Sequence, residues 1–336
     1  MNKAFYISKY GGPEVMEWGE FPPAPLGPKD VRIQIHAASV NPLDWRIRSG
    51  ALKVILPYTF PLILGNDCSG VVSEVGREVT RFKVGDAVYS RVQDDRIGTF
   101  AQEIVTAEAA VAHKPTNLTH AEAASLPMVL LTAHQVLTEA APLRAGQSVL
   151  IHGGAGAVGS MAIQVARHLG LRVATTVSGK DTDFVKGLGA ETVVDYRTQK
   201  FEDVVRGMDA VLDGIGMENL LRSFQTVNPG ATVVSISDGP DVQTAKSRGL
   251  SPLLWPVFMA LSAKPNAAAR KAQAHYRYWF MHTDGGRLES LTPLLENGTL
   301  RPHLDRIFPF EQTAQALAYA ESGKAKGKVV IQMRDE

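Results

Sequence analysis

The chain has 336 residues, of which 45% are hydrophobic and 21% are charged, and its formal net charge is +1. This is the composition of a globular protein, and the length favours two domains over a single core. The near-zero net charge excludes an overall field that would attract nucleic acid or an anionic membrane, so any anion site must be local. We therefore expect neither a nucleic-acid nor a membrane partner.

The chain contains one cysteine, Cys68, and so has no second thiol for an intramolecular disulfide. Residues 1–12 lack the apolar run of a secretory signal. The most apolar stretch, residues 250–262, contains two prolines and is far shorter than the ~20 residues that span a bilayer. We interpret it as a buried helix or a pocket wall. A reducing, cytoplasmic location is predicted.

The order of predicted elements indicates an α/β protein. Over residues 3–112, short apolar or alternating runs are separated by glycine and proline, which is typical of β-strands joined by turns. Helical spacing follows, and the middle of the chain then alternates strand-like and helical segments, as in a doubly wound parallel sheet. The sequence predicts a β-rich domain over 1–122, completed by 290–336, and a doubly wound domain over 123–289.

Residues 154–159, Gly-Ala-Gly-Ala-Val-Gly, match the G-x-G-x-x-G pattern of dinucleotide-binding turns. They follow a predicted strand at 148–152 and open a predicted helix, which is the context that the pattern requires. One glycine makes the tight turn, the next lets the backbone approach a pyrophosphate, and the last permits close packing of helix on sheet. A purely structural glycine turn is the alternative. We predict a Rossmann domain with cofactor contacts at Gly154, Gly156, Ala157, Val158 and Gly159.

The end of the following strand predicts which dinucleotide binds. Sites that prefer NAD place an Asp or Glu roughly 20 residues after the turn. Here the strand ends at Ser178 and Lys180, with no carboxylate before Asp181. A hydroxyl and an ammonium suit a 2′-phosphate, and Tyr196 ends the neighbouring strand beside the same crevice. We therefore predict NADPH as the cofactor, with Ser178, Lys180 and Tyr196 as contacts. A solvated surface lysine is the alternative interpretation of Lys180.

Five segments of the sequence resemble the medium-chain dehydrogenase/reductase superfamily, and its quinone oxidoreductase branch fits best. They are NPLDWRIRSG (41–50), PLILGNDCSGVVSEVG (61–76), VGDAVYS (84–90), LTAHQVL (131–137) and GKVVI (327–331). The resemblance covers essentially the whole chain. It implies a GroES-like β-rich catalytic domain, a Rossmann domain and a homodimer. The C-terminal part is similar to alkenal/quinone reductases and reticulon-interacting mitochondrial homologues, which implies NADPH with quinone or enone substrates.

The resemblance also implies site residues. Asn41 and Thr132 are expected near the nicotinamide, as catalytic and cofactor-binding residues, and Lys328 is expected to contact the cofactor. Tyr58 is the candidate proton donor, because the segment after the first motif supplies an active-site tyrosine in some relatives. A packed aromatic is the alternative role for Tyr58, and solvent would then supply the proton.

Zinc-containing members of this superfamily hold a catalytic zinc with Cys, His and Cys and carry a further lobe with four cysteines. Here Asn41 stands at the first cysteine and Asn66 at the histidine, and one cysteine cannot make a four-cysteine site. We predict no metal. Without a Lewis acid the acceptor must be activated, as quinones and enones are. Asp44 and Asp67 also match motif positions, with the tethering of a loop as an equal alternative.

The predicted function is NADPH-dependent reduction of quinones or α,β-unsaturated carbonyl compounds by hydride transfer, without zinc. An enoyl-thioester reductase is a second interpretation, since it shares the superfamily and the cofactor. A non-catalytic NADPH-binding regulator is a third. A pure binding module would have no need of the motifs at 41–50 and 131–137, which favours an enzyme.

Overall fold

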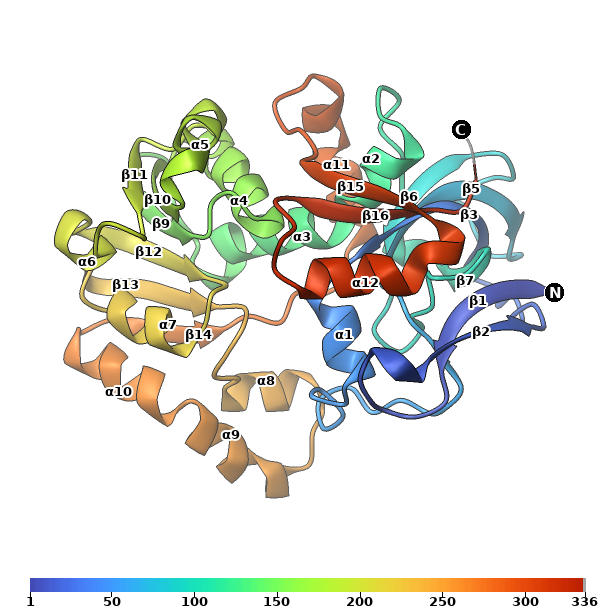
Figure 1. Ribbon diagram of the computed structural model, residues 1–336, viewed down its shortest axis with the longest axis horizontal. Coiled ribbons are helices and arrows are strands. Elements are labelled where there is room, and N and C mark those ends of the chain that lie inside the picture. The colour runs from blue at the N-terminus through green and yellow to red at the C-terminus, as the bar shows by residue number, and fades with distance from the viewer. Residues whose placement is uncertain (335–336) are drawn as a thin grey trace. The chain divides into compact units, whose positions relative to one another are not determined.

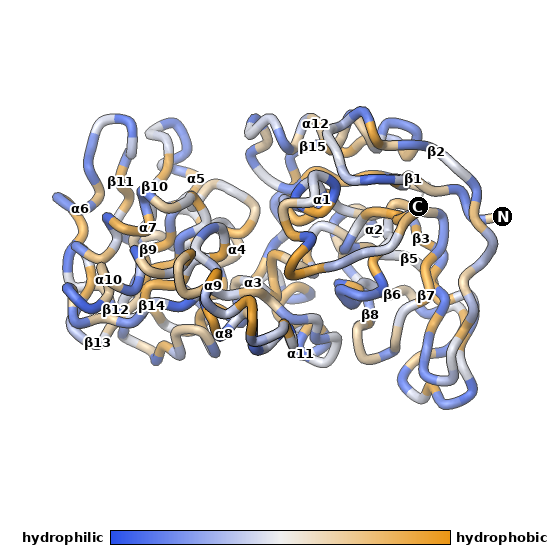
Figure 2. The backbone as a smooth tube through the Cα atoms, turned by 90° about the horizontal axis from the view of Figure 1, so that it is seen from below, coloured by the Kyte–Doolittle hydropathy of each residue, from blue (hydrophilic) through white to orange (hydrophobic). Residues whose placement is uncertain are grey.

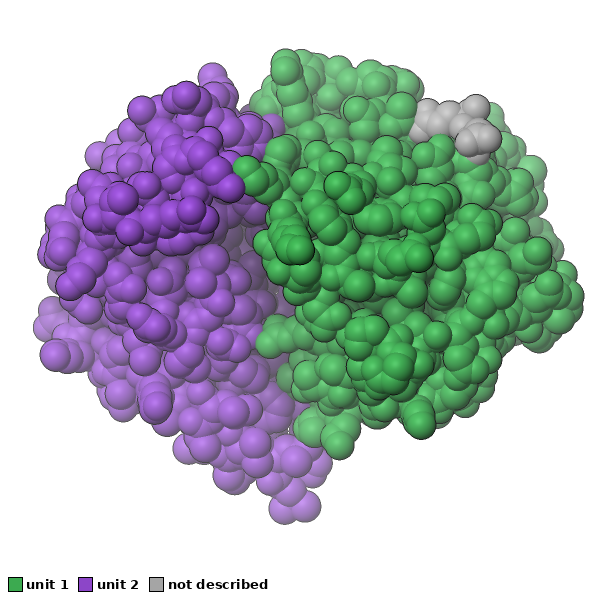
Figure 3. Space-filling model, in the orientation of Figure 1, with its two compact units in different colours: residues 1–131, 282–336 green, residues 132–281 purple. Residues whose placement is uncertain are grey.

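The computed structural model describes residues 1–334, which divide into two compact units. Unit 1 consists of residues 1–131 and the C-terminal segment from residue 282, and unit 2 consists of residues 132–281 (Figure 3). Unit 1 is β-rich, and unit 2 is a parallel α/β layer structure (Figure 1). The predicted α/β class, with a β-rich part followed by a doubly wound part, is confirmed.

Unit 1 is built on a seven-stranded sheet in the order β15-β16-β3-β5-β6-β8, with β7 also paired to β3. Its strands are β3 (Asp30–Val40), β5 (Asp67–Val75), β6 (Ala87–Arg91), β7 (Glu103–Ala107), β8 (Val111–His113), β15 (Leu304–Pro309) and β16 (Lys328–Gln332). A three-stranded sheet, β2-β1-β4, is formed by β1 (Asn2–Ile7), β2 (Met16–Phe21) and β4 (Leu62–Ile63). The helices of unit 1 are α1 (Pro42–Arg48), α2 (His120–Ala124), α11 (Gly285–Glu296) and α12 (Thr313–Glu321). A further helix, α3 (Pro127–Gln135), spans the division between the units.

Strand β3 is the centre of unit 1 because its side chains alternate between the core and the surface. Ile33 and Ile35 are fully buried, whereas Arg32 and Gln34 remain partly exposed, which is the period of two expected for a sheet covered on one face. Hydrophobic stretches of the chain, coloured orange, occur in both units (Figure 2). Strand β16 pairs antiparallel with β3, with Val329 opposite Val40. The C-terminal strand therefore completes the sheet that the first domain begins.

Unit 2 contains a six-stranded parallel sheet in the order β11-β10-β9-β12-β13-β14. Its strands are β9 (Ser148–His152), β10 (Arg172–Val177), β11 (Thr192–Asp195), β12 (Met208–Asp213), β13 (Val227–Ser235) and β14 (His275–Tyr278). The helices are α4 (Ala157–His168), α5 (Thr182–Leu188), α6 (Phe201–Val204), α7 (Met217–Ser223), α8 (Val242–Ser247), α9 (Trp255–Leu261) and α10 (Ala263–Lys271). The order reverses between β9 and β12, so the dinucleotide turn after β9 lies at the switch point where doubly wound sheets bind ligands.

The units differ from the predicted domains in two places, for the same reason. The predicted boundary at 122 cuts helix α2, but Ala121 and Ala124 of this helix pack on Ala37 and Val330 of unit 1. Helix α11 begins before the predicted boundary at 290 and packs on β8. A helical period shows that an apolar face exists, and only the folded chain shows which sheet that face covers.

The apolar stretch at 250–262 also differs from its prediction. It does form a helix, α9, but the expected burial is wrong, because Phe258 is 2% exposed while Leu253 is 88% and Met259 61% exposed. Only one side of α9 meets the rest of unit 2. Within residues 1–334, no helix is long enough and apolar enough to cross a membrane.

The assignment of α11 to unit 1 generates a test with two adjacent glycines. A Cβ on Gly285 would lie 2.5 Å from the backbone oxygen of Val111, whereas a Cβ on the exposed Gly286 would meet nothing closer than 3.5 Å. We expect Gly285→Ala to lower the free energy of unfolding by about 1–3 kcal/mol through overpacking. Gly286→Ala should raise it by up to about 1 kcal/mol through helix propensity. Denaturant titration followed by circular dichroism measures both, and equal effects of the two substitutions would contradict this packing of α11 on β8.

Candidate active site

The turn after β9 is fixed to the neighbouring strand by its own backbone. The N–H of Gly153 donates to Oγ1 of Thr176 (3.2 Å), and the N–H of Gly154 donates to the carbonyl oxygen of the same residue (3.1 Å). Gly153 has φ +67°, a left-handed conformation that favours glycine. The residue with positive φ is therefore one position before the G-x-G-x-x-G motif.

The three motif glycines have two different roles. A Cβ on Gly154 would lie 2.1 Å from Oγ1 of Thr175, and a Cβ on Gly159 would lie 2.2 Å from the carbonyl oxygen of Gly153. These two positions are filled by neighbouring atoms, so only glycine fits them. A Cβ on Gly156 would meet only the Gly153 oxygen, at 3.2 Å. Space beside the backbone is therefore open at Gly156, and a phosphate group could approach there.

Helix α4 begins directly after Gly156, and its first residues Ala157 and Val158 are only half-buried. The N–H groups of a first helical turn have no intrahelical acceptor, and the helix dipole places partial positive charge there. The open position at Gly156 and these N–H groups together fit a pyrophosphate. The predicted contacts Gly154, Gly156, Ala157, Val158 and Gly159 thus form one continuous turn.

The predicted phosphate-binding residues follow two adjacent strands. Val177 of β10 lies opposite Asp195 of β11 in parallel register, so the residues that follow both strands emerge at one edge of the sheet. Ser178 is 8% exposed. Lys180 is exposed, and Tyr196 is 57% exposed with the Arg197 guanidinium 5.9 Å from its ring centre. The structure therefore brings Ser178, Lys180 and Tyr196 to the same edge.

The structure adds Asp195, which the sequence analysis missed. Its Oδ2 lies 2.6 Å from the position of a Cβ on Gly179, so the carboxylate is next to the Ser178–Lys180 turn. Its Oδ1 accepts a hydrogen bond from the N–H of Arg197 (3.0 Å). A carboxylate at such a place accepts ribose hydroxyls and repels a 2′-phosphate. The only signal that could have found Asp195 is the pairing of β10 with β11.

In unit 1 a group of buried polar side chains gathers where β3 ends and β5 and β16 begin. We name it the Asn41 cluster, and it consists of Ser39, Asn41, Asp44, Asn66, Asp67 and Lys328. Each of these residues is 4% exposed or less. Because β16 pairs with β3, with Val329 opposite Val40, the preceding Lys328 lies beside the following Asn41.

The amide of Asn41 is held at both ends. Nζ of Lys328 donates to Oδ1 of Asn41 (2.6 Å) and to the carbonyl oxygen of Val40 (3.0 Å). Nδ2 of Asn41 donates to Oδ2 of Asp67 (3.0 Å), and the same carboxylate oxygen lies 3.7 Å from Nζ of Lys328. The side-chain orientation of Asn41 is thus fixed by a cation on one side and an anion on the other.

Asp44 joins the Asn41 cluster to the start of α1. Its Oδ2 accepts the N–H of Asn41 and its Oδ1 accepts Nδ2 of Asn66, both at 2.7 Å. Burial raises the pKa of Asp44 to about 7, and the nearby Asp67 carboxylate adds to this. Burial also raises the pKa of Asp67 and lowers the pKa of Lys328, while the opposite charge of each partner acts against these shifts. The predicted loop-tethering role of Asp44 is matched by this capping geometry.

The two residues predicted to replace zinc ligands, Asn41 and Asn66, both lie in the Asn41 cluster. The Lys328 ammonium bonds directly to Asn41, so a cation of the chain itself contacts the residue at the position of the first cysteine. Cys68 is fully buried, and burial raises its pKa. Within residues 1–334, no group of three or more His, Cys, Asp or Glu side chains could hold a metal ion. Amide groups beside an ammonium are a poor donor set for Zn²⁺, which takes thiolate, imidazole and carboxylate ligands.

Two further predicted residues, Tyr58 and Thr132, are not members of the Asn41 cluster. The hydroxyl of the half-buried Tyr58 donates to the carbonyl oxygen of Asp94 (2.6 Å), and the Asp94 carboxylate pairs with Arg91. Tyr58 therefore ties two loops of unit 1 together. Thr132, on α3, is 6% exposed and is the first residue of unit 2. Lys328 is engaged inside the Asn41 cluster, and its predicted cofactor contact stays a prediction.

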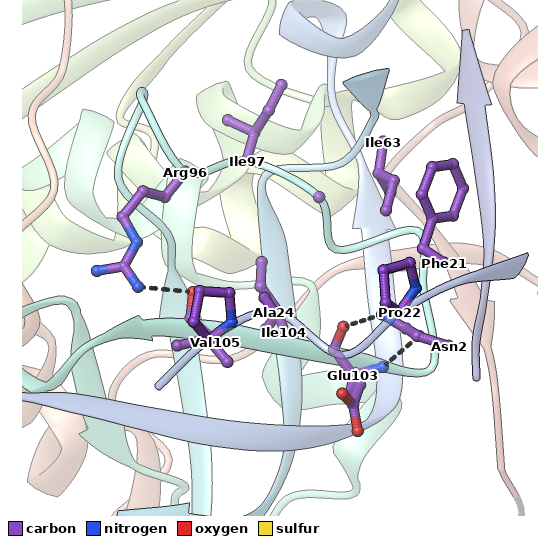
Figure 4. A pocket seen from close by; sticks show the side chains of 12 residues that line it. Asn2, Phe21, Pro22, Ala24, Ile63, Arg96, Ile97, Glu103, Ile104 and Val105 are labelled. Atoms are coloured by element: carbon purple, nitrogen blue, oxygen red, sulfur yellow. Dashed lines mark hydrogen bonds between the residues drawn. The ribbon is translucent and has the colours of Figure 1, made fainter. Parts of the chain in front are cut away.

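A cavity of about 410 Å³ in unit 1 contains none of the predicted site residues (Figure 4). Its lining is largely apolar, with Phe21, Ile63 and Ile97 among the side chains that face it. Its polar groups are already paired, since Arg96 bonds to both carboxylate oxygens of Asp30 at 2.8 Å and Nδ2 of Asn2 donates to the carbonyl oxygen of Glu103. We do not assign the reaction to this cavity.

Comparison with known proteins places these features in a family. Residues 27–116 match the alcohol dehydrogenase GroES-like domain, and residues 188–331 match a family described as zinc-binding dehydrogenase. The human NAD(P)H oxidoreductase RTN4IP1, mitochondrial, is 34% identical over 351 residues, which cover 98% of this chain and 88% of the relative. The NADPH-dependent alkenal/one oxidoreductase, chloroplastic, of Arabidopsis thaliana is 32% identical over 98% of this chain and 79% of its own. The structure of a quinone oxidoreductase from Coxiella burnetii superposes with a TM-score of 0.83 at 28% identity and covers 99% of both chains.

The Asn41 cluster generates a stability prediction for Lys328→Met. Removing the ammonium leaves the Asp67 carboxylate buried without a cation, so we expect the free energy of unfolding at neutral pH to fall by about 3–5 kcal/mol. The uncompensated carboxyls have pKa values above their unfolded values. These carboxyls bind more protons in the folded state than in the unfolded state. The loss of unfolding free energy relative to the natural protein should therefore become smaller as the pH is lowered toward 5.

Urea titrations of the two proteins across this pH range measure the effect. Lys324→Met, on an exposed lysine near the same strand, is the matched control and should differ little from the natural protein. A deficit of Lys328→Met that does not change with pH would mean that lost packing, and not lost charge, is responsible.

Proposed function

We propose that this chain, which belongs to the quinone oxidoreductase branch of the medium-chain dehydrogenase/reductase superfamily, reduces quinones or α,β-unsaturated carbonyl compounds with NADPH and without zinc. Its relatives identify it as an oxidoreductase of this superfamily. One observation supports the proposed reaction with NADPH and without zinc. A dinucleotide turn of the right geometry accompanies an Asn41 cluster in which two amides, Asn41 and Asn66, stand at the positions of zinc ligands and the Lys328 ammonium bonds to the first of them.

When bound, NADPH supplies the hydride. The open position at Gly156 and the first turn of α4 would hold its pyrophosphate, and Ser178, Lys180 and Tyr196 would hold its 2′-phosphate. The name of the Arabidopsis relative, an NADPH-dependent enzyme, supports this choice. Asp195 acts against it, so the preference for NADPH over NADH is set by a balance between Lys180 and Asp195.

The substrate class follows from what the Asn41 cluster offers. An ordinary ketone or alcohol needs a Lewis acid or a strong proton donor to react with a nicotinamide, whereas a conjugated acceptor does not. We propose that Asn41 and Thr132 orient the nicotinamide, as the family resemblance implies. The bonds of Asn41 to Lys328 and Asp67 hold its amide in one orientation, which is what a positioning group requires.

The proton is the second requirement of the reaction. The Tyr58 hydroxyl already donates to Asp94, and donation to a substrate would cost that bond. We therefore propose solvent as the proton source, with Tyr58 as a loop tether. The homodimer and the cytoplasmic location also remain predictions, and the printed names of the human and Arabidopsis relatives are those of mitochondrial and chloroplastic proteins.

Cofactor choice is tested at Lys180. A charge-assisted hydrogen bond to phosphate contributes roughly 1.5–3 kcal/mol, so Lys180→Ala should weaken NADPH binding by about 10- to 100-fold and leave NADH binding nearly unchanged. Isothermal titration with both dinucleotides measures this, and Lys186→Ala, on an exposed lysine of α5, is the matched control. Asp195→Asn should shift the preference in the opposite direction, toward NADPH. Equal losses of both dinucleotides in Lys180→Ala would show that Lys180 does not contact the phosphate.

The reaction itself is tested with three acceptors in parallel, 1,4-naphthoquinone, an alkenal and an enoyl thioester, by following NADPH oxidation and identifying products. We expect the alkenal to yield the saturated aldehyde, because hydride addition at the β-carbon leaves negative charge on the carbonyl oxygen, where hydrogen-bond donors stabilise it. Recovery of the allylic alcohol would reject this assignment. Turnover of the enoyl thioester alone would favour the thioester reductase, and NADPH binding with no turnover would favour the regulator.

Two controls belong to the same assay. Activity should survive treatment with a chelator, and its loss with recovery on adding zinc would reject the metal-free mechanism. Tyr58→Phe should lower turnover by less than about tenfold. A loss of roughly 10²-fold or more, the range of general acid catalysis, would instead identify Tyr58 as the proton donor.

A further inference from the structure

Helix α9 of unit 2 presents an exposed apolar face. The four large side chains concerned are Leu253, Val257, Met259 and Leu261, which are 88%, 52%, 61% and 47% exposed. We name them the α9 face. Val257 and Leu261 are four residues apart on α9 and so share one side of the helix. Leu253 precedes Val257 by four residues and belongs to the 3₁₀ turn before α9. Phe258 and Ser262, each 2% exposed, are on the buried side.

This arrangement is the reverse of an ordinary surface helix, in which charged and polar side chains cover the exposed side. Single exposed apolar residues are common on protein surfaces. Here four of them belong to one short helix and the 3₁₀ turn before it (Pro252–Leu254), and the exposed positions between them, Pro256 and Ala260, are apolar as well. A concentrated apolar surface of this kind indicates an interaction site.

The charged residues of the segment that carries the α9 face, between Asp241 and Asp284, are all of one sign. Residues 242–283 contain no Asp or Glu and six basic residues, Lys246, Arg248, Lys264, Arg270, Lys271 and Arg277. Nζ of Lys246 lies 4.8 Å from the centre of the Trp255 ring at the start of α9. Lys264 is exposed and follows Leu261 by three residues. Ammonium groups therefore border the α9 face at both of its ends.

We infer that the α9 face binds the surface of a membrane that contains anionic lipid. In this arrangement α9 lies in the plane of the interface, its apolar side chains enter the boundary between headgroups and acyl chains, and Lys246 and Lys264 contact lipid phosphates. Helix α9 has seven residues and does not span the bilayer. Figure 1 shows α8, α9 and α10 next to one another along one end of unit 2.

A lipid surface fits these observations better than a protein partner does. An anionic membrane offers an apolar phase and negative charge together, and it requires no hydrogen-bonding groups from the α9 face. A second copy of this chain is the main alternative. Because a two-fold contact places the same patch on both subunits, it would bring Lys246 and Lys264 of each copy near those of the other, and like charges oppose such a contact.

The inference does not depend on the proposed reaction, because it concerns a surface and not the cofactor turn or the Asn41 cluster. The experiment is flotation of the full chain with phosphatidylcholine vesicles, with and without phosphatidylglycerol. We expect the protein to float with the anionic vesicles only, and less as the salt concentration rises.

Two sets of variants separate the apolar and the ionic contributions. The triple variant Leu253→Ser, Val257→Ser, Leu261→Ser should weaken partitioning by about tenfold or more, through lost insertion of apolar side chains. The double variant Lys246→Gln, Lys264→Gln should weaken it by about 10- to 30-fold, which two cations near an anionic surface imply. Val84→Ser with Ile307→Ser removes two apolar residues that are 60% and 46% exposed elsewhere, and it should float like the natural protein.

All substituted positions are exposed, so each variant should fold, and melting curves followed by circular dichroism check this. Absence of flotation with anionic vesicles, or flotation of the triple variant equal to that of the natural protein, would overturn the inference. Equal flotation with neutral vesicles would overturn the role of the lysines. Sedimentation velocity without lipid completes the test, because a dimer of the natural protein that the triple variant alone disrupts would make the α9 face a contact between copies and would overturn membrane binding.

Discussion

The contact between the Lys328 ammonium and the Asn41 cluster is the interaction on which the architecture of unit 1 depends. Asp44 and Asp67 are both fully buried, and a buried carboxylate is tolerated only when a cation and hydrogen-bond donors compensate the loss of water. The compensating cation is 287 positions away from Asn41 in the sequence. The first domain therefore cannot bury its polar site favourably until the C-terminal strand β16 has paired with β3.

The same contact restricts the chemistry. A catalytic zinc acts because it has an open coordination position for substrate, whereas Nζ of Lys328 is already bonded to Asn41 and Val40. The ammonium keeps the electrostatic function of a cation, which is to balance the carboxylates, and does not provide a free site for a substrate oxygen. In the proposed metal-free reaction the protein contributes orientation and hydrogen bonding, which suffice for acceptors that are already electron-poor. The proposed restriction to quinones and enones thus follows from where the charge is located.

Features that depend on local sequence were predictable, and features that depend on pairing were not. The strand, turn and helix around residues 154–159 are contiguous, so the pattern predicted the dinucleotide turn. Asp195 was missed because only the register of β10 with β11 brings it beside Gly179. The bond of Lys328 to Asn41 is equally non-local, although the family resemblance had marked both residues. For α9 the pattern gave the helix correctly, but hydropathy does not reveal whether an apolar face meets a partner within its own chain.

The net charge shows a similar limit of whole-chain quantities. A formal charge of +1 is a sum, and it excludes a long-range field over the whole molecule without excluding a strongly basic surface. Residues 242–283 contain six basic and no acidic residues, and the carboxylates that balance them lie elsewhere in the sequence. Salt screens charges beyond roughly 8–10 Å at physiological ionic strength, so a surface next to α9 responds to Lys246 and Lys264 and hardly at all to distant acids. The composition therefore excludes long-range attraction of an anionic partner by the protein as a whole. It does not exclude binding of an anionic surface by a single helix with its own flanking basic residues.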